Sequence, residues 1–292
     1  MTDTVEILAG FKPESKFFVG LDSDGCVFDT MEIKHKECFI PMFIKYFELQ
    51  PISKYARQTW EFVNLYSKTR GINRFPALVR TIKLLSTRQE VKLRKVKLFN
   101  TEELESWIAT QSRLTNATLE AEIKNGHDNL QIVLDWSIAV NDMIADIVKN
   151  VPPFPFCKES ILRISESADI LVVSQTPTEA LNREWKEHNL SGFVKAIAGQ
   201  EMGSKSDHLR LFTYNKYEPD HVLMIGDAIG DLQAAKENNV LFYPIIPGQE
   251  EFSWQRLFND AINRFFKLEY KGDYEDKIIA EFEKCLPENP LW

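Results

Sequence analysis

Residues that commonly form disulfides or bind zinc are few in this 292-residue sequence. Its four cysteines are scattered without a CxxC pair, which argues against a disulfide framework or a zinc site and suits a reducing compartment. The five histidines lack H-x-x-x-H spacing, so a histidine metal site or a Ser-His-Asp site has no support. The cysteines are interpreted as small buried hydrophobic residues: Cys26, Cys38, Cys157 and Cys285.

Long hydrophobic runs are also missing. The longest apolar stretches, such as 170–173, are far shorter than the roughly 20 residues that a membrane span needs. The N-terminus lacks the basic-then-apolar order of a signal peptide. These absences predict a cytoplasmic protein without a membrane partner. With 44% hydrophobic residues, the chain is still long enough to bury one large domain or two unequal ones.

Positive charge is scarce overall but locally concentrated. The formal net charge of −8 opposes nonspecific binding to nucleic acid, which requires a local excess of Lys and Arg. Between Lys54 and Lys97, however, basic residues far outnumber the two acidic residues, Glu61 and Glu90. We therefore expect no nucleic-acid partner, and we expect the basic window to serve some more local purpose.

Short apolar runs that end in polar or glycine residues alternate with stretches of helical periodicity. The runs at 17–22, 170–174, 221–226 and 240–246 are typical of buried parallel strands. Helical patterns lie between them, at 160–167, 179–189, 205–214 and 230–238. This alternation predicts an α/β fold, a doubly wound parallel sheet with a Rossmann-like core. Ligands of such sheets bind at the carboxyl ends of the strands.

The interval 31–150 differs, because it shows amphipathic helical patterns without strand alternation, at 33–47, 75–85, 102–112 and 129–148. Three prolines between positions 152 and 155 close it, since proline cannot continue a helix. We therefore predict a catalytic core formed by 1–30 and 151–292, with a C-terminal helical extension, and an inserted all-α domain at 31–150.

Two acids follow the first predicted strand. Asp22 and Asp24 occupy alternate positions of a turn that Gly25 permits. One carboxylate can attack a substrate while the other transfers protons. A calcium loop would also begin with D-x-D, but its glycine belongs at position six, whereas Gly25 is at position four, and its position twelve would be Ile33 rather than Glu.

Further polar residues follow the later strands. Asp227 and Asp231 come after 221–226 and offer the oxygen ligands that Mg²⁺ prefers. Ser174 ends the strand at 170–174, and Lys205 opens a helix after the apolar run 196–198. A hydroxyl and an ammonium group are suited to hold the oxygens of a phosphoryl group.

In this order, Asp-x-Asp, Ser, Lys and Asp-x-x-x-Asp resemble the four-motif signature of the haloacid dehalogenase-like superfamily. The resemblance covers 17–29 and about 157–246, and the helical insertion matches the α-helical cap of that family in position and class. It implies that Asp22 is the nucleophile, that Asp24 is the general acid and base, and that Ser174 and Lys205 bind the phosphoryl group. It also implies a Mg²⁺ ion held by Asp22, the carbonyl of Asp24, and Asp227, with Asp231 supporting the metal shell or Lys205.

Asp24 also indicates which of the reactions known in this family is to be expected. Members of the family that cleave carbon–halogen bonds lack this acid, because a halide leaves without a proton. The resemblance therefore implies a phosphatase acting on a small phosphorylated metabolite through an aspartyl-phosphate. Two positions depart from the family pattern: Cys26 stands where threonine is usual, and Ser23 where an apolar residue is more common.

The basic window is expected to help bind the substrate. Arg70 and Arg74 flank Gly71 in a polar segment of the insertion, and caps in this family close over the strand ends and contact substrate. A solvated helix face is the alternative, and for 92–97 it is the preferred interpretation.

Other functions remain open at this point. A sugar-phosphate mutase would use the same Asp22 and return the phosphoryl group to a sugar. A P-loop enzyme is less favoured, because Ser204 stands where the G-x-x-x-x-G-K-[ST] pattern requires glycine. A noncatalytic binding protein on the same fold is also disfavoured, since every proposed catalytic side chain is present.

Overall fold

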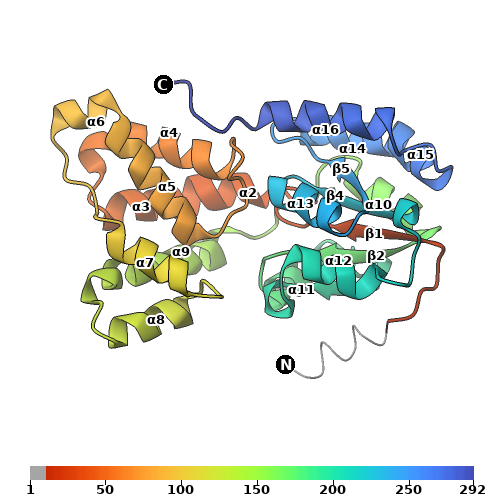
Figure 1. The fold of residues 1–292 in the computed structure, drawn as a ribbon, viewed down its shortest axis with the longest axis horizontal. Coiled ribbons are helices and arrows are strands. Elements are labelled where there is room, and N and C mark those ends of the chain that lie inside the picture. The colour runs from red at the N-terminus through yellow and green to blue at the C-terminus, as the bar shows by residue number, and fades with distance from the viewer. Residues whose placement is uncertain (1–10) are drawn as a thin grey trace. The chain divides into compact units, whose positions relative to one another are not determined.

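The computed structural model describes residues 11–292, which form two compact units (Figure 1). Of the described residues, the sheet unit contains 11–30 and Asn150–Leu286. The helical unit contains Met31–Lys149 and the C-terminal segment Pro287–Trp292. The chain therefore passes between the two units three times. In its described part, no helix is both long and apolar enough to cross a membrane.

The sheet unit is built on five parallel strands in the order β3-β2-β1-β4-β5. Each strand after β1 is reached through at least one helix, as parallel pairing requires. The short run that precedes Lys205 forms the edge strand β3. The strands are β1 (Phe17–Leu21), β2 (Ala168–Val173), β3 (Ala196–Ala198), β4 (Val222–Gly226) and β5 (Leu241–Pro244).

Helices cover both faces of this sheet, which confirms the predicted doubly wound fold. Alternate strand residues point to opposite faces, so Val19 joins one hydrophobic cluster and Phe18 the other. The first face is covered by α10 (Cys157–Ser165), α11 (Thr178–Glu187), α14 (Glu250–Arg256) and α15 (Ile262–Phe266). The second is covered by α12 (Lys205–Thr213) and α13 (Ile229–Glu237), and α16 (Asp273–Cys285) contributes to both clusters.

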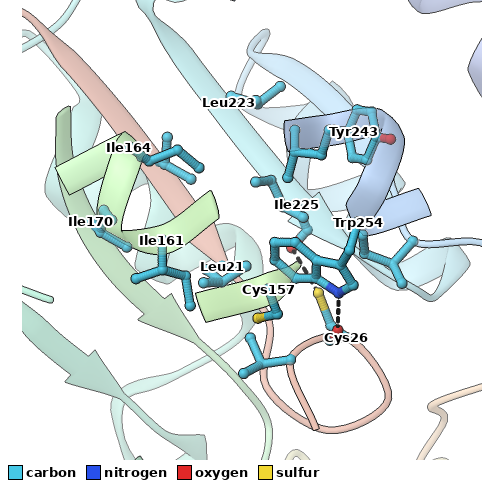
Figure 2. Close-up of a cluster of buried hydrophobic side chains, with 14 of the residues drawn as sticks. Leu21, Cys26, Cys157, Ile161, Ile164, Ile170, Leu223, Ile225, Tyr243 and Trp254 are labelled. Atoms are coloured by element: carbon cyan, nitrogen blue, oxygen red, sulfur yellow. Dashed lines mark hydrogen bonds between the residues drawn. The ribbon is translucent and has the colours of Figure 1, made fainter. Parts of the chain in front are cut away.

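The first face buries large side chains directly below the end of β1. Figure 2 shows Trp254 of α14 lying over the turn that contains Cys26, with Ile161 and Cys157 of α10 beside it. Trp254 and Cys26 are fully buried. This packing fixes the segment that carries the two N-terminal acids.

The helical unit has no strand, and all of its residues are described. Its core contains three buried tryptophans, Trp60, Trp107 and Trp136. The helices are α2 (Thr30–Ile33, which starts in the sheet unit), α3 (Ile40–Tyr46), α4 (Ser53–Asn64), α5 (Arg74–Thr87), α6 (Gln89–Arg94), α7 (Glu102–Thr110), α8 (Asn116–Lys124) and α9 (Gln131–Ile147). A π-helical segment, Lys34–Phe39, continues α2 into α3.

The last six residues, 287–292, pack on this unit rather than on the sheet. The Trp292 ring lies 5.4 Å from the Phe62 ring, and the guanidinium of Arg88 lies 4.3 Å from the Trp292 ring centre. The carbonyl of Glu288 accepts a hydrogen bond from Arg80. These contacts explain why the C-terminal segment belongs to the helical unit although α16 belongs to the sheet unit.

Candidate active site

The acids that follow β1 and β4 come together because these strands are neighbours. Leu21 pairs with Ile225, and the Asp22 N–H extends the ladder by donating to the Ile225 carbonyl at 3.0 Å. Asp22 and Asp227 are both buried, with 5% and 1% of their surface exposed. Adjacent strand ends therefore place both carboxylates inside the protein at one edge of the sheet.

The turn after β1 is organised by its backbone. The Ser23 carbonyl accepts hydrogen bonds from the N–H groups of Cys26, Val27 and Phe28, at 3.3, 2.8 and 3.2 Å. Gly25 has φ of 76°, in the left-handed region that side chains disfavour, which explains the glycine at this position. This compact turn holds Asp22 and Asp24 at its start.

Lys205 connects the two acidic strand ends. Its Nζ lies 2.7 Å from Oδ2 of Asp22 and 2.7 Å from Oδ1 of Asp231. Lys205 is the first residue of α12, whose N-terminus is fixed by Ser204 and Asp207 in a capping box. The lysine thus contacts one carboxylate 183 residues before it in the chain and another 26 residues after it.

Asp231 reaches the lysine because β4 ends in glycine. A Cβ at Gly226 would lie 2.3 Å from Cγ of Asp231, so any side chain there would displace the carboxylate. The other oxygen of Asp231 accepts the Ala228 N–H at 3.0 Å, which caps the start of α13. Asp231 is therefore held at both oxygens.

Negatively charged groups outnumber positively charged groups in this cluster. Burial raises the pKa of Asp22 to about 6, with Lys205 opposing the shift and Asp227 adding to it. Burial also raises the pKa of Asp231. For Lys205 burial acts to lower the pKa, but Asp22 and Asp231 outweigh it and raise the pKa above its usual range. Three buried carboxylates thus face one ammonium group.

The same three carboxylates could hold a metal ion. One oxygen from each of Asp22, Asp227 and Asp231 lies within 4.8 Å of the other two. All of the donors are hard oxygens, which suits Mg²⁺, and a divalent cation would offset the excess negative charge. The residues present therefore fit a magnesium ion.

Asp24 takes part in a different set of contacts. The Thr30 hydroxyl donates to its Oδ1 at 2.5 Å, and the Thr176 hydroxyl donates to its Oδ2 at 2.6 Å. Thr30 lies six residues after Asp24 and Thr176 two residues after Ser174, and neither threonine was predicted to have a role. Their only sequence signal is the presence of a hydroxyl residue close behind each motif.

Ser174 is positioned at the end of β2 beside this group. Its N–H donates to the Ala198 carbonyl of β3 at 3.0 Å, and its Oγ accepts the Thr176 N–H at 3.2 Å. Ser174 is buried, with 2% of its surface exposed. The hydroxyl therefore shapes the turn that also carries Thr176 toward Asp24.

The two arginines predicted to contact substrate make contacts within the helical unit. Arg70 is buried and donates to the Leu65 carbonyl at 3.0 Å. Arg74 lies over the Phe39 ring and donates to Ser137 and Asn141, and burial lowers its pKa to about 10. The substrate contact of Arg70 and Arg74 stays a prediction.

Comparison with known proteins gives a family match over more than half of the chain. A model described as haloacid dehalogenase-like hydrolase matches residues 77–244. That range contains Ser174, Lys205, Asp227 and Asp231, and it begins after Asp22 and Asp24. No curated protein matches the chain significantly.

Similar solved structures include three proteins of low sequence identity. A haloacid dehalogenase-like family hydrolase from Streptococcus pneumoniae is 15% identical, with 82% of this chain and 90% of that chain covered and a TM-score of 0.43. A predicted phosphoglycolate phosphatase from Haemophilus somnus is 12% identical, with 79% and 86% covered and a TM-score of 0.46. A predicted phosphatase from Clostridium acetobutylicum is 13% identical, with 79% and 85% covered and a TM-score of 0.41.

Proposed function

Because this chain belongs to the haloacid dehalogenase-like hydrolase family, we propose that it is a Mg²⁺-dependent phosphatase that hydrolyses a small phosphorylated metabolite through a phosphorylated Asp22. One observation carries the proposal. The Lys205 Nζ lies 2.7 Å from both Asp22 and Asp231, in a cluster whose carboxylates exceed its cations. Such an arrangement is suited to receive a phosphoryl group and a divalent cation together.

In the first half-reaction an oxygen of Asp22 attacks phosphorus, and the bond between phosphorus and the ester oxygen breaks. Asp24 gives a proton to the departing alkoxide, so the alcohol leaves neutral. The two threonine hydroxyls orient the Asp24 side chain, because each holds one of its carboxyl oxygens. The product is an acyl phosphate on Asp22.

In the second half-reaction a water molecule attacks the phosphorus of phosphorylated Asp22. Asp24, now a carboxylate, accepts a proton from that water, and inorganic phosphate leaves as the Asp22 carboxylate is restored. Lys205 and Ser174 bind the nonbridging oxygens in both steps. A Mg²⁺ ion held by Asp22, Asp227 and the Asp24 carbonyl, with Asp231 in support, would offset the charge of the phosphoryl group.

The direct test is phosphate release from a panel of phosphorylated metabolites, with Mg²⁺ and with excess chelator. Asp22→Asn should keep the fold and lose activity by several orders of magnitude, on the order of 10³-fold or more, because an amide is not a nucleophile. Asp142→Asn, at an exposed position of α9, is the matched control and should retain full activity. Near-normal turnover by Asp22→Asn would contradict the mechanism.

The same panel distinguishes hydrolysis from transfer. A phosphatase releases one phosphate for every ester cleaved. A sugar-phosphate mutase would instead isomerise a sugar phosphate with little phosphate release, since its Asp22 phosphoryl group returns to sugar.

A further inference from the structure

Ser23, the residue between the two catalytic acids, has every polar group engaged. Its N–H donates to Oδ1 of Asp22 at 2.8 Å, and its carbonyl accepts the three N–H groups of the following turn. Its hydroxyl accepts a hydrogen bond from the Trp185 indole at 3.0 Å and donates to Glu184 at 3.4 Å. Ser23 is fully buried, so protein groups alone fix its orientation.

In this arrangement the two carboxylate oxygens of Asp22 have different hydrogen-bond partners. Oδ1 of Asp22 accepts the Ser23 N–H, whereas Oδ2 lies 2.7 Å from Lys205. A rotation of the peptide at Ser23 would therefore turn the Asp22 carboxylate away from its bonded position. The geometry of attack on phosphorus depends on that orientation.

Trp185 is a rigid anchor for the Ser23 hydroxyl. It belongs to α11, is fully buried, and packs edge-on against Phe28 of the same turn with ring centres 5.9 Å apart. Its indole can only donate, and Ser23 Oγ is the acceptor within reach. The indole thus holds residue 23 from one side of the turn.

A second tryptophan holds the same turn farther along. Trp254 of α14 donates to the Cys26 carbonyl at 2.8 Å, and Cys26 Sγ lies 3.8 Å from the Ile225 carbonyl of β4, as Figure 2 shows. Ser23 and Cys26 are also the two positions that depart from the family pattern. Both departures therefore lie where a tryptophan or a strand contacts the turn.

We propose that Ser23 and Trp185 are positioning residues for phosphoryl transfer: the indole fixes the Ser23 hydroxyl, and Ser23 fixes the carboxylate of Asp22. This inference rests on the proposed function. The pair adds no chemistry to the reaction and contacts no reacting atom. Its effect is expected in kcat, through the rate at which Asp22 is phosphorylated, and not in KM.

The test is a double-mutant cycle with Ser23→Ala and Trp185→Phe. Each single variant should lower kcat on the order of 10-fold or more with KM nearly unchanged, because a misoriented nucleophile reacts slowly. The double variant should show the same loss as a single variant, since both changes break one hydrogen bond. Trp107→Phe is the matched control, because Trp107 is equally buried and its indole nitrogen has no hydrogen-bond partner within residues 11–292; it should leave kcat unchanged.

Thermal stability separates positioning from a purely structural role. Ser23→Ala leaves a buried indole N–H without its acceptor and should lower the melting temperature, whereas the double variant should regain much of it. If kcat recovers together with the melting temperature, or if the losses of the single variants multiply, the positioning role is wrong. Failure of the wild type to release phosphate would overturn the proposed function instead, so the two failures are distinguishable.

Discussion

Both units bury charged side chains, but the groups that contact these side chains differ between the units. In the sheet unit, Lys205 has 15% of its side chain exposed and contacts Asp22 and Asp231, with 6% and 0% exposed. In the helical unit, Arg88 has only 4% of its side chain exposed; it donates to the neutral oxygens of Thr59 and Gln58, lies over aromatic rings, and pairs with one carboxylate, that of the exposed Glu90, at 3.8 Å. Burial alone therefore does not identify a reactive site. The sheet unit differs in that three buried carboxylates gather beside one ammonium group at the strand ends.

The strongest test of this difference is Lys205→Met, which keeps the length of the side chain and removes its charge. We expect phosphatase activity to fall by on the order of 10³-fold or more, because the phosphoryl oxygens and the carboxylates lose their cation. Breaking the buried ion pairs should also cost about 3–5 kcal/mol of unfolding free energy. Urea denaturation and phosphate-release rates measure the two effects.

Lys186→Met, at an exposed position of α11, is the control and should change neither quantity. A Lys205→Met enzyme with undiminished activity would show that the sheet unit buries this charge for structure alone.

Asp24→Asn tests the proton transfer within the sheet unit. With an alkyl phosphate, the loss should be about 10²-fold or more, within the usual range for general acid catalysis. With p-nitrophenyl phosphate, formation of the phosphoryl-enzyme should suffer less, because that leaving group needs no proton. Stopped-flow measurement of the first step with both substrates checks this. Equal losses would contradict the role assigned to Asp24.

Gly226→Ala probes how tightly the site is assembled. The added Cβ would lie 2.3 Å from Cγ of Asp231, so the carboxylate must move away from Lys205. We expect activity to fall about 10²-fold, as small misplacements at a reacting centre can cost. Gly230→Ala is the matched control, because an added Cβ there meets no atom within 4 Å. Equal activities of the two variants would show that Asp231 tolerates displacement.

The strand ends explain why much of the site could be predicted from sequence. Asp22 and Asp227 each follow a buried run, and parallel strands place such residues at one edge. The contacts of Thr176 with Asp24 and of Trp185 with Ser23 could not be predicted, because neither Thr176 nor Trp185 lies directly at the end of a predicted strand. The periodicity of a helix indicates which of its faces is buried. It does not indicate which distant polar group a side chain on that face contacts.

The helical unit shows the same limit. Its helical patterns predicted an all-α insertion, and α5, α7 and α9 follow them. The docking of Trp292 on Arg88 and Phe62 gave no sequence signal, because a short tail has no periodicity. The basic window likewise shows where positive charge is concentrated in the sequence. It does not indicate that Arg74 donates hydrogen bonds to Ser137 and Asn141.

The smallest expected effect concerns Arg70 and Arg74. If these arginines bind the part of the substrate beyond the phosphoryl group, replacing either with Ala should lower kcat/KM for the metabolite about 10-fold, the loss of one charge-assisted contact. Activity toward p-nitrophenyl phosphate should barely change. Lys92→Ala, at an exposed position of α6, should affect neither substrate.

Parallel losses on both substrates, together with a lower unfolding free energy, would contradict substrate binding by the arginines. Arg70 and Arg74 would then be structural, and the contrast between the two units would become sharper.

Whether Asp22 is the nucleophile can be tested most directly by locating the phosphoryl group during turnover. The enzyme is mixed with substrate carrying labelled phosphorus, quenched in acid within milliseconds, digested, and mapped by mass spectrometry. We expect label on the peptide containing Asp22, released by hydroxylamine as expected for an acyl phosphate, and absent in Asp22→Asn. Label on any other residue, or steady hydrolysis with no labelled enzyme in the wild type, would contradict it.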